Sequence, residues 1–177
     1  IDDTFNIKKF AIKSNFNFDN LNINYRSNFL KKYLTSFDNK IAIKNPQILF
    51  EYSNDIINLQ LDGKYLLQNK EDNFFIKYKG SENNYELYTL LNLDDSDLKI
   101  DEIQYLKKKN IPSKLEILLN KSTNGFNLKK ISFKENKNYI SIDNLYISDD
   151  FKLLSVDKID ANFFNSKGVK NNFQIKK

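Results

Sequence analysis

The chain contains no Cys and no His among its 177 residues. Without Cys there can be no disulfide, no thiol nucleophile and no Cys-based metal site. Without His the usual general base near neutral pH is missing, and so are the commonest zinc ligand and every Ser-His or Cys-His dyad. No other combination of residues in the sequence predicts catalysis, so we expect a non-enzymatic protein that needs no cofactor and no metal.

Gly and Pro are also scarce, with four and two residues respectively. The glycines are too scattered to form a phosphate-binding loop. No Pro-, Gly- or Ser-rich linker divides the chain, which predicts a single β-rich domain over residues 1–177. The chain begins with Ile, has no Met and ends on a predicted strand, so we expect a segment of a longer, repeat-like protein. No apolar run approaches the about 20 residues that span a bilayer.

The net charge of +5 comes from 28 basic and 23 acidic residues that are mixed along the chain. Arg26 is the sole Arg, the residue that most often reads guanine and phosphate through paired hydrogen bonds. The acidic cluster at 94–97 lacks the further ligands, the Gly and the distal Glu of a calcium loop. Lys, Asn, Ile, Phe and Tyr dominate, as an AT-rich genome favours. We therefore expect a solvated lysine-rich surface and no nucleic-acid partner.

An eight-residue sequence pattern, which we call the phrase, recurs along the chain. In residues 140–147 it reads apolar, polar, apolar, two polar, apolar, polar, apolar, with Asp143 and Asn144 at its centre. Each half alternates with the period of a strand that has one buried face. Copies of the phrase occupy residues 5–12, 16–23, 98–105, 126–133, 140–147 and 154–161. The later copies start 28, 14 and 14 residues apart, a spacing that suits an antiparallel meander.

The two central polar residues of the phrase break its alternation. A β-bulge would reset the alternation and bend the strand, which keeps all four apolar side chains on one face. A two-residue hairpin turn at the centre would do the same. Two copies have Lys-Lys at the centre, which is poor at positive φ, and the arms of such a hairpin would be very short. The phrase therefore favours bulged, bent strands.

Residues 27–37 change to a helical period, and Ser27 can cap the start of a short helix there. The apolar residues on one face of this helix are Phe29, Leu30, Tyr33, Leu34 and Phe37. Such a helix either plugs one end of a sheet or forms a gate or membrane-facing element.

Other segments predict strands at 41–43, 48–52, 56–67, 74–78 and 85–93. Pro46 predicts a break or an edge position, and Asp62-Gly63 is the best turn signal in the chain. Glu102 and the lysines at 107–109 flank a possible helical turn, which should stop before Pro112. The lysines at 107–109 then lie in a solvated loop or touch anionic lipid head groups.

Alternation over most of the chain produces a broad apolar sheet face with little helix to cover it. A second sheet, the curvature of the sheet itself or an apolar ligand must bury such a face. Repeated bulges curl a sheet. The predicted fold is mainly β, a curved antiparallel meander that forms an open groove or half-barrel with one or two short helices. A closed sandwich with a dry core is the alternative.

The sequence also resembles a known family. Phrases such as "ISIDNLYI", "LSVDKIDANFF" and the closing "NNFQIKK" are similar to those of the AsmA-like bacterial envelope proteins, the AsmA, YhdP and TamB type. The similarity is greatest to the central region of YhdP-like members and covers roughly residues 98–177. The first half of the chain is similar only in its general pattern of residue types, and no family catalytic residue can be carried over.

The resemblance implies a stretch of a long β-groove that carries phospholipid between the inner and outer membranes. It implies a periplasmic location, attachment to the inner membrane through regions outside this segment, and phospholipid acyl chains as the partner. The residues expected to line the groove are Phe16, Phe18, Leu21, Ile23, Ile131, Phe133, Ile140, Ile142, Leu145, Ile147, Val156, Ile159 and Phe163. Two alternatives remain open: a β-sandwich interaction or surface module with a closed core, and a cytosolic bridge-like lipid-transfer segment of eukaryotic origin.

Overall fold

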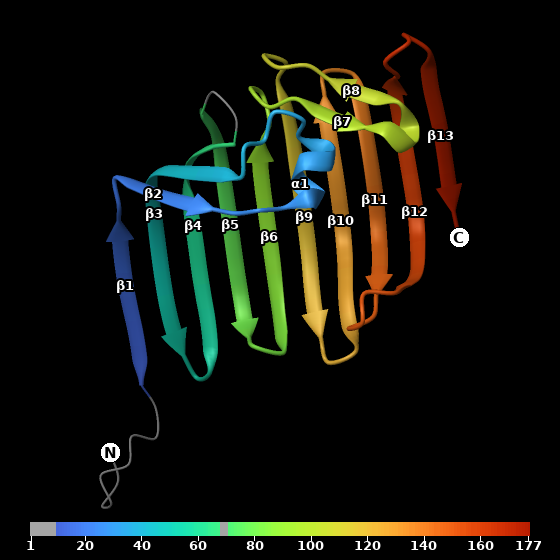
Figure 1. Ribbon diagram of the computed structural model, residues 1–177. Coiled ribbons are helices and arrows are strands. Elements are labelled where there is room, and N and C mark those ends of the chain that lie inside the picture. Colours follow the sequence, from blue (N-terminus) through green and yellow to red (C-terminus); the bar gives the residue numbers. More distant parts are fainter. Residues whose placement is uncertain (1–9, 68–70) are drawn as a thin grey trace, which may run out of the picture.

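The computed structural model describes residues 10–67 and 71–177 and contains an 11-stranded antiparallel sheet (Figure 1). Neighbours in sequence are mostly neighbours in the sheet, in the order β1-β3-β4-β5-β6-β9-β10-β11-β12-β13, and β2 pairs with the start of β3. The strands are β1 (Ala11–Asn17), β2 (Asn20–Asn24), β3 (Lys40–Ser53), β4 (Ile56–Leu66), β5 (Glu71–Ser81), β6 (Asn84–Asn92), β9 (Ser113–Ser122), β10 (Gly125–Glu135), β11 (Asn138–Ile147), β12 (Leu153–Phe164) and β13 (Lys170–Lys176). The prediction of a mainly β protein with one large antiparallel sheet is confirmed.

The phrase forms a line of bulges across three neighbouring strands. In β10, Leu128 pairs with Leu119 but Lys130 pairs with Leu118, so Lys129 is an extra residue relative to β9. Asn144 in β11 and Asp157 in β12 likewise have no paired residue in the register of the sheet, although the residues on both sides of each are paired. Asn144 has φ 50, and its side-chain amide donates to Asp157 Oδ2 at 3.0 Å. The parity break in these copies is therefore a bulge, as predicted, and Asp143 and Asn144 are not the tip of a hairpin.

Other copies of the phrase fold differently. The copy at 16–23 is divided between β1 and β2, which both pair with β3 on either side of a register shift between Lys44 and Gln47. The copy at 98–105 is a hairpin: β7 (Leu98–Ile100) leads through a 3-10 turn (Asp101–Ile103) into β8 (Tyr105–Lys107), and Ile100 pairs with Tyr105. The bulge prediction was wrong for that copy. Most of the copy at 5–12 lies outside the described residues.

Two local predictions failed in the first half. Asp62 and Gly63 lie inside β4, not in a turn. A Cβ on Gly63 would lie 3.1 Å from both Lys44 O and Pro46 Cα, so this Gly allows close approach of the bulged part of β3. Pro46 neither breaks β3 nor makes it an edge strand, because it lies within the register shift, where no ladder hydrogen bond is needed from it. The strands predicted at 48–52 and 56–67 are confirmed within β3 and β4, which are joined by a short connection after Ser53.

The helix α1 (Asn28–Tyr33) confirms the predicted helix, although it is shorter than residues 27–37. Ser27 caps it and accepts a hydrogen bond from Leu30 N at 3.1 Å. Leu34 and Phe37, just beyond the helix, are buried, whereas Phe29 is 69% exposed. Of the expected apolar face, the buried part is thus the segment after the helix.

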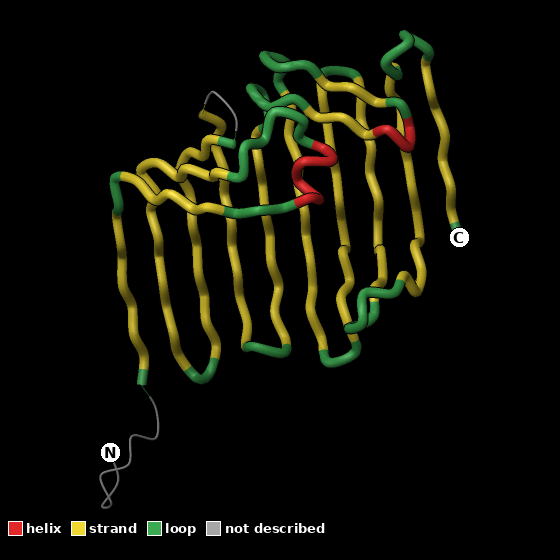
Figure 2. The backbone as a smooth tube through the Cα atoms, in the orientation of Figure 1, coloured by secondary structure: helices red, strands yellow, loops and turns green. Residues whose placement is uncertain are grey.

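We call α1 and the β7–β8 hairpin the cap, because they lie over one end of the sheet, the upper end in Figures 1 and 2. Lys32 of α1 forms an ion pair with Glu102 of the 3-10 turn, which ties the two parts of the cap together. A cluster of buried residues lies between the cap and the sheet. Its members are Tyr65, Phe74, Leu93, Tyr105, Phe133, Ala161 and Phe163. The hydrophobic core of the described residues is therefore at the upper end.

Candidate apolar binding face

The register of β9 shows which residues share a face of the sheet. This strand has no bulge, so Ile117 and Leu119 point to one face and Leu118 to the other. Directly paired residues of antiparallel strands lie on the same face. Leu119 pairs with Leu128, which pairs with Leu145, so the bulges restore the apolar residues of β10 and β11 to the face of Ile117.

A nearly unbroken apolar row crosses the whole sheet on this face. Its residues, each paired with the next, are Phe16, Ile48, Leu61, Ile76, Thr89, Ile117, Ile131, Ile142, Ile159 and Ile175. Thr89 is the polar exception, and it still presents a methyl group. At about 4.8 Å between strands the row is roughly 43 Å long. We call this row the apolar row, and the side of the sheet that carries it the apolar face.

Further apolar residues extend this face toward the lower end. The next row consists of Phe50, Leu59, Tyr78, Leu87, Leu119, Leu128, Leu145 and Val156. Below it the face becomes amphipathic, with Tyr52, Tyr85 and Lys121 among Ile57, Phe126 and Ile147.

The apolar face is covered only at the upper end among the described residues. The side chains of the apolar row are half-buried or exposed, with Phe16 at 47% and Ile175 at 54% exposure where the row meets the sheet edges. At the lower end Leu153 and Leu154 are 65% and 62% exposed. An apolar surface of this breadth without a covering layer is a binding-site candidate.

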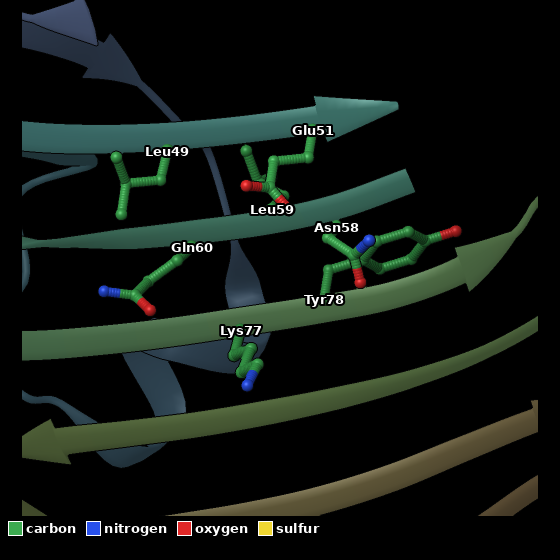
Figure 3. A pocket seen from close by; sticks show the side chains of 7 residues that line it. All are labelled: Leu49, Glu51, Asn58, Leu59, Gln60, Lys77 and Tyr78. Carbon is green, nitrogen blue, oxygen red and sulfur yellow. The ribbon is translucent and has the colours of Figure 1, made fainter. Parts of the chain in front are cut away.

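The opposite face is polar and carries ion pairs such as Lys13–Glu51, Lys130–Glu116 and Lys158–Asp160. A small apolar group, Phe75 with Tyr88, Leu90 and Leu118, interrupts it. A shallow hollow of about 280 Å³ lies over β3, β4 and β5, and Figure 3 shows its lining. It is lined on the polar face by Leu49, Glu51, Asn58, Gln60 and Lys77, and its lining also includes Leu59 and Tyr78, which belong to the second row of the apolar face. Because charged and amide side chains dominate it, this hollow does not suit an acyl chain.

The predicted lining residues divide into three groups. The first group lies on or beside β1 and β2, separated from β10 by the strands β3, β4, β5, β6 and β9, and consists of Phe16, Phe18, Leu21 and Ile23, at 38–51% exposure. The second group lies on the apolar face of β10 to β12 and consists of Ile131, Ile140, Ile142, Leu145, Ile147, Val156 and Ile159. Phe133 and Phe163 are 7% and 2% exposed beneath the cap, so they pack in the protein core.

The sequence prediction missed the buried polar network that holds the cap. Lys107 is 0% exposed, and its Nζ donates to the carbonyl oxygens of Asp94, Ser96 and Lys108 at 3.2, 2.7 and 3.1 Å. Burial lowers the pKa of this ammonium group, and the nearby carboxylate of Glu135 opposes that shift. The expectation that residues 107–109 form a solvated loop or contact lipid head groups was therefore wrong for Lys107. The next residue, Lys108, is exposed, and nothing in the local sequence distinguishes the buried lysine from the exposed one.

Two buried tyrosines belong to the same end of the sheet. Tyr65 donates to Asn92 O and Tyr105 to Glu135 Oε2. Burial raises the pKa of Tyr65, with a smaller contribution from Asp72; burial and then the hydrogen bond to Glu135 raise the pKa of Tyr105.

We expect Tyr65 and Tyr105 to ionise only when the protein unfolds. Their folded-state pKa values lie above those of the unfolded chain, so the stability they contribute is complete below about pH 10 and is lost as the pH rises further. An ultraviolet titration of tyrosinate should show a first phase from exposed tyrosines and a later phase that coincides with loss of the far-ultraviolet circular dichroism signal. Tyr65→Phe should reduce the late phase. A single phase on folded protein would contradict the prediction.

The described residues contain no group of Asp and Glu side chains arranged to hold a metal ion, and no helix among them is long and apolar enough to cross a membrane. Comparisons with protein-family models, with curated proteins and with solved structures found no match. The apolar face is thus the candidate site that the geometry itself supplies.

Proposed function

We propose that this chain is a non-enzymatic segment of an envelope-biogenesis protein, whose apolar face conducts phospholipid between the inner and outer membranes. The observation that carries the proposal is the apolar row, which runs from one edge of the sheet to the other. The AsmA-like resemblance supports it and implies a periplasmic location with attachment to the inner membrane through other regions. In this proposal the line of bulges in β10 to β12 curls the sheet, and the whole chain acts as one domain.

The mechanism is passive. Each methylene of an acyl chain that leaves water for the apolar face contributes about 0.8 kcal/mol. Since residues of similar size and polarity line successive strands, the free energy of a bound chain stays nearly level as it moves across the sheet. A lipid can then slide from strand to strand, while its head group remains in water at the rim of the face.

Phospholipid should be recovered from the purified, folded protein by solvent extraction and mass spectrometry. The variant Leu59→Asp places a carboxylate in the second row of the apolar face. Covering that charge with an acyl chain should cost more than about 1.4 kcal/mol of binding free energy, so the variant should bind at least about tenfold less lipid.

Gln60→Asp is the matched control for Leu59→Asp. Gln60 is the next residue of β4 and lies on the polar face opposite Lys77, so this variant should bind lipid as the original chain does. Equal lipid content in the two variants, or a lipid-free original chain in folded form, would contradict the proposal. The second outcome would favour a module whose apolar face is closed by protein.

A further inference from the structure

The apolar face is asymmetric along the strands. At the upper end it runs into the core beneath the cap, where Tyr105, Phe133 and Phe163 are at most 7% exposed. At the lower end it meets Tyr52, Tyr78, Tyr85 and Lys121, which we call the lower rim. One end of the face is therefore closed and apolar, and the other is open and amphipathic.

The polar groups of three lower-rim residues, Tyr52, Tyr78 and Lys121, are hydrogen-bonded away from the apolar row. Tyr52 donates to Asp55 Oδ1 at 2.8 Å and Tyr78 to Ser81 O at 2.9 Å, and both acceptors lie in or beside the lower turns. Lys121 behaves in the same way, since its Nζ donates to Ser122 O and Asp149 Oδ1, each at 2.6 Å. The stems and rings remain on the apolar face, as amphipathic side chains do at a boundary between oil and water.

Lys121 can accept a further partner. An ammonium group has three donors, and the two contacts to Ser122 and Asp149 use two of them. Its Nζ also lies 4.8 Å from the ring centroid of Phe126, on the side of the apolar face. The side chain of Lys121 is 14% exposed, so a phosphate group at the rim would meet the third donor of an ammonium group that is already ion-paired with Asp149, directly beside apolar surface.

The dimensions of the uncovered face match one acyl chain. Lys121 and Ile117 are four residues apart in β9, which corresponds to about 14 Å of strand. One leaflet of a bilayer contributes about half of the roughly 30 Å hydrocarbon thickness. An acyl chain that starts at the lower rim thus ends near the apolar row, before it meets the core beneath the cap.

We propose that a phospholipid binds this face with its acyl chains along the strands, its terminal methyl groups toward the cap, and its phosphate at Lys121 on the lower rim. The inference rests on the proposed function and adds the orientation of the lipid. Head groups would then move along the lower rim while the acyl chains move sideways from strand to strand. The cap closes the upper end, so a lipid with the reverse orientation would place its charged phosphate against apolar core.

The absence of Trp from the chain allows a direct test of orientation. Two variants, Tyr85→Trp at the lower rim and Ile117→Trp in the apolar row, each introduce a single fluorophore into the full chain. The probes are phosphatidylcholines brominated either near the carboxyl end or near the terminal methyl of an acyl chain. We expect the first lipid to quench Tyr85→Trp more strongly and the second to quench Ile117→Trp more strongly.

The outcomes separate the orientation from the proposed function. Equal quenching by both lipids at both positions, or the reverse order, would overturn the orientation while lipid binding stands. Absence of quenching in both variants, each shown to be folded by circular dichroism, would overturn the proposed function and the orientation with it. Lys121→Gln should weaken binding about tenfold through loss of one charge-assisted hydrogen bond, whereas Lys79→Gln on the polar face should leave it unchanged. Equal binding by these two variants would overturn the role of Lys121.

Discussion

Replacing Lys107 with methionine is expected to lower the free energy of unfolding by about 3–5 kcal/mol. Methionine fills a similar volume but donates no hydrogen bond, so the carbonyl groups of Ser96 and Lys108 lose their buried donor. Asp94 O keeps the hydrogen bond that Ile111 N donates to it at 3.2 Å. Each buried polar group left without a partner costs about 1–3 kcal/mol. The buried carboxylate of Glu135 also loses the attraction of a nearby positive charge.

Urea unfolding followed by circular dichroism measures this effect, and Lys108→Met is the matched control. Lys108 is the next residue and is exposed, so its replacement should change the free energy of unfolding by less than about 0.5 kcal/mol. If Lys107→Met is no less stable than Lys108→Met, the buried ammonium group does not hold the cap on the sheet.

Replacing Asn144 with valine is expected to lower the free energy of unfolding by about 2–3 kcal/mol. Asn144 has φ 50, a left-handed conformation that costs a side chain about 1–2 kcal/mol and is worst for a β-branched residue. The variant also loses the hydrogen bond to Asp157, which contributes about 1 kcal/mol.

Asn144→Gly separates the two contributions to this effect. Glycine adopts positive φ without strain, so this variant should lose mainly the hydrogen bond and be destabilised by about 1 kcal/mol. Urea unfolding of both variants makes the comparison. Equal stability of the valine and glycine variants would show that the backbone at the bulge does not constrain residue 144.

The bulges could be predicted from the sequence because they follow from a local pattern. Asp143-Asn144 interrupts an apolar alternation that resumes at Leu145, and a bulge restores the face without reversing the chain. The same pattern at 98–105 gives a hairpin instead. The difference lies in tertiary context, because the segment at 98–105 leaves the sheet and its two short halves find only each other as partners. Sequence alternation alone does not say whether a neighbouring strand is present.

Burial beneath the cap depends on contacts between distant residues, so it could not be predicted locally. Phe133 and Phe163 have the same alternating neighbours as Ile131 and Ile159, yet only the former pair lies against Tyr105 of the cap. Lys107 is similarly indistinguishable from Lys108 in sequence. The lower rim left a clearer signal: Tyr52 and Tyr85 each lie next to a turn, at the end of an otherwise apolar alternation.

The meander order has a consequence for cooperativity. Because each strand pairs mainly with its neighbours in sequence, the sheet resembles a one-dimensional stack in which stability is a sum of nearest-neighbour terms. Such a stack would fray strand by strand from β1 and β13. The cap opposes this, since its core joins residues of β4, β5, β10 and β12 in one cluster. The strands beneath it should therefore open as a single unit, with the edge strands free to separate first.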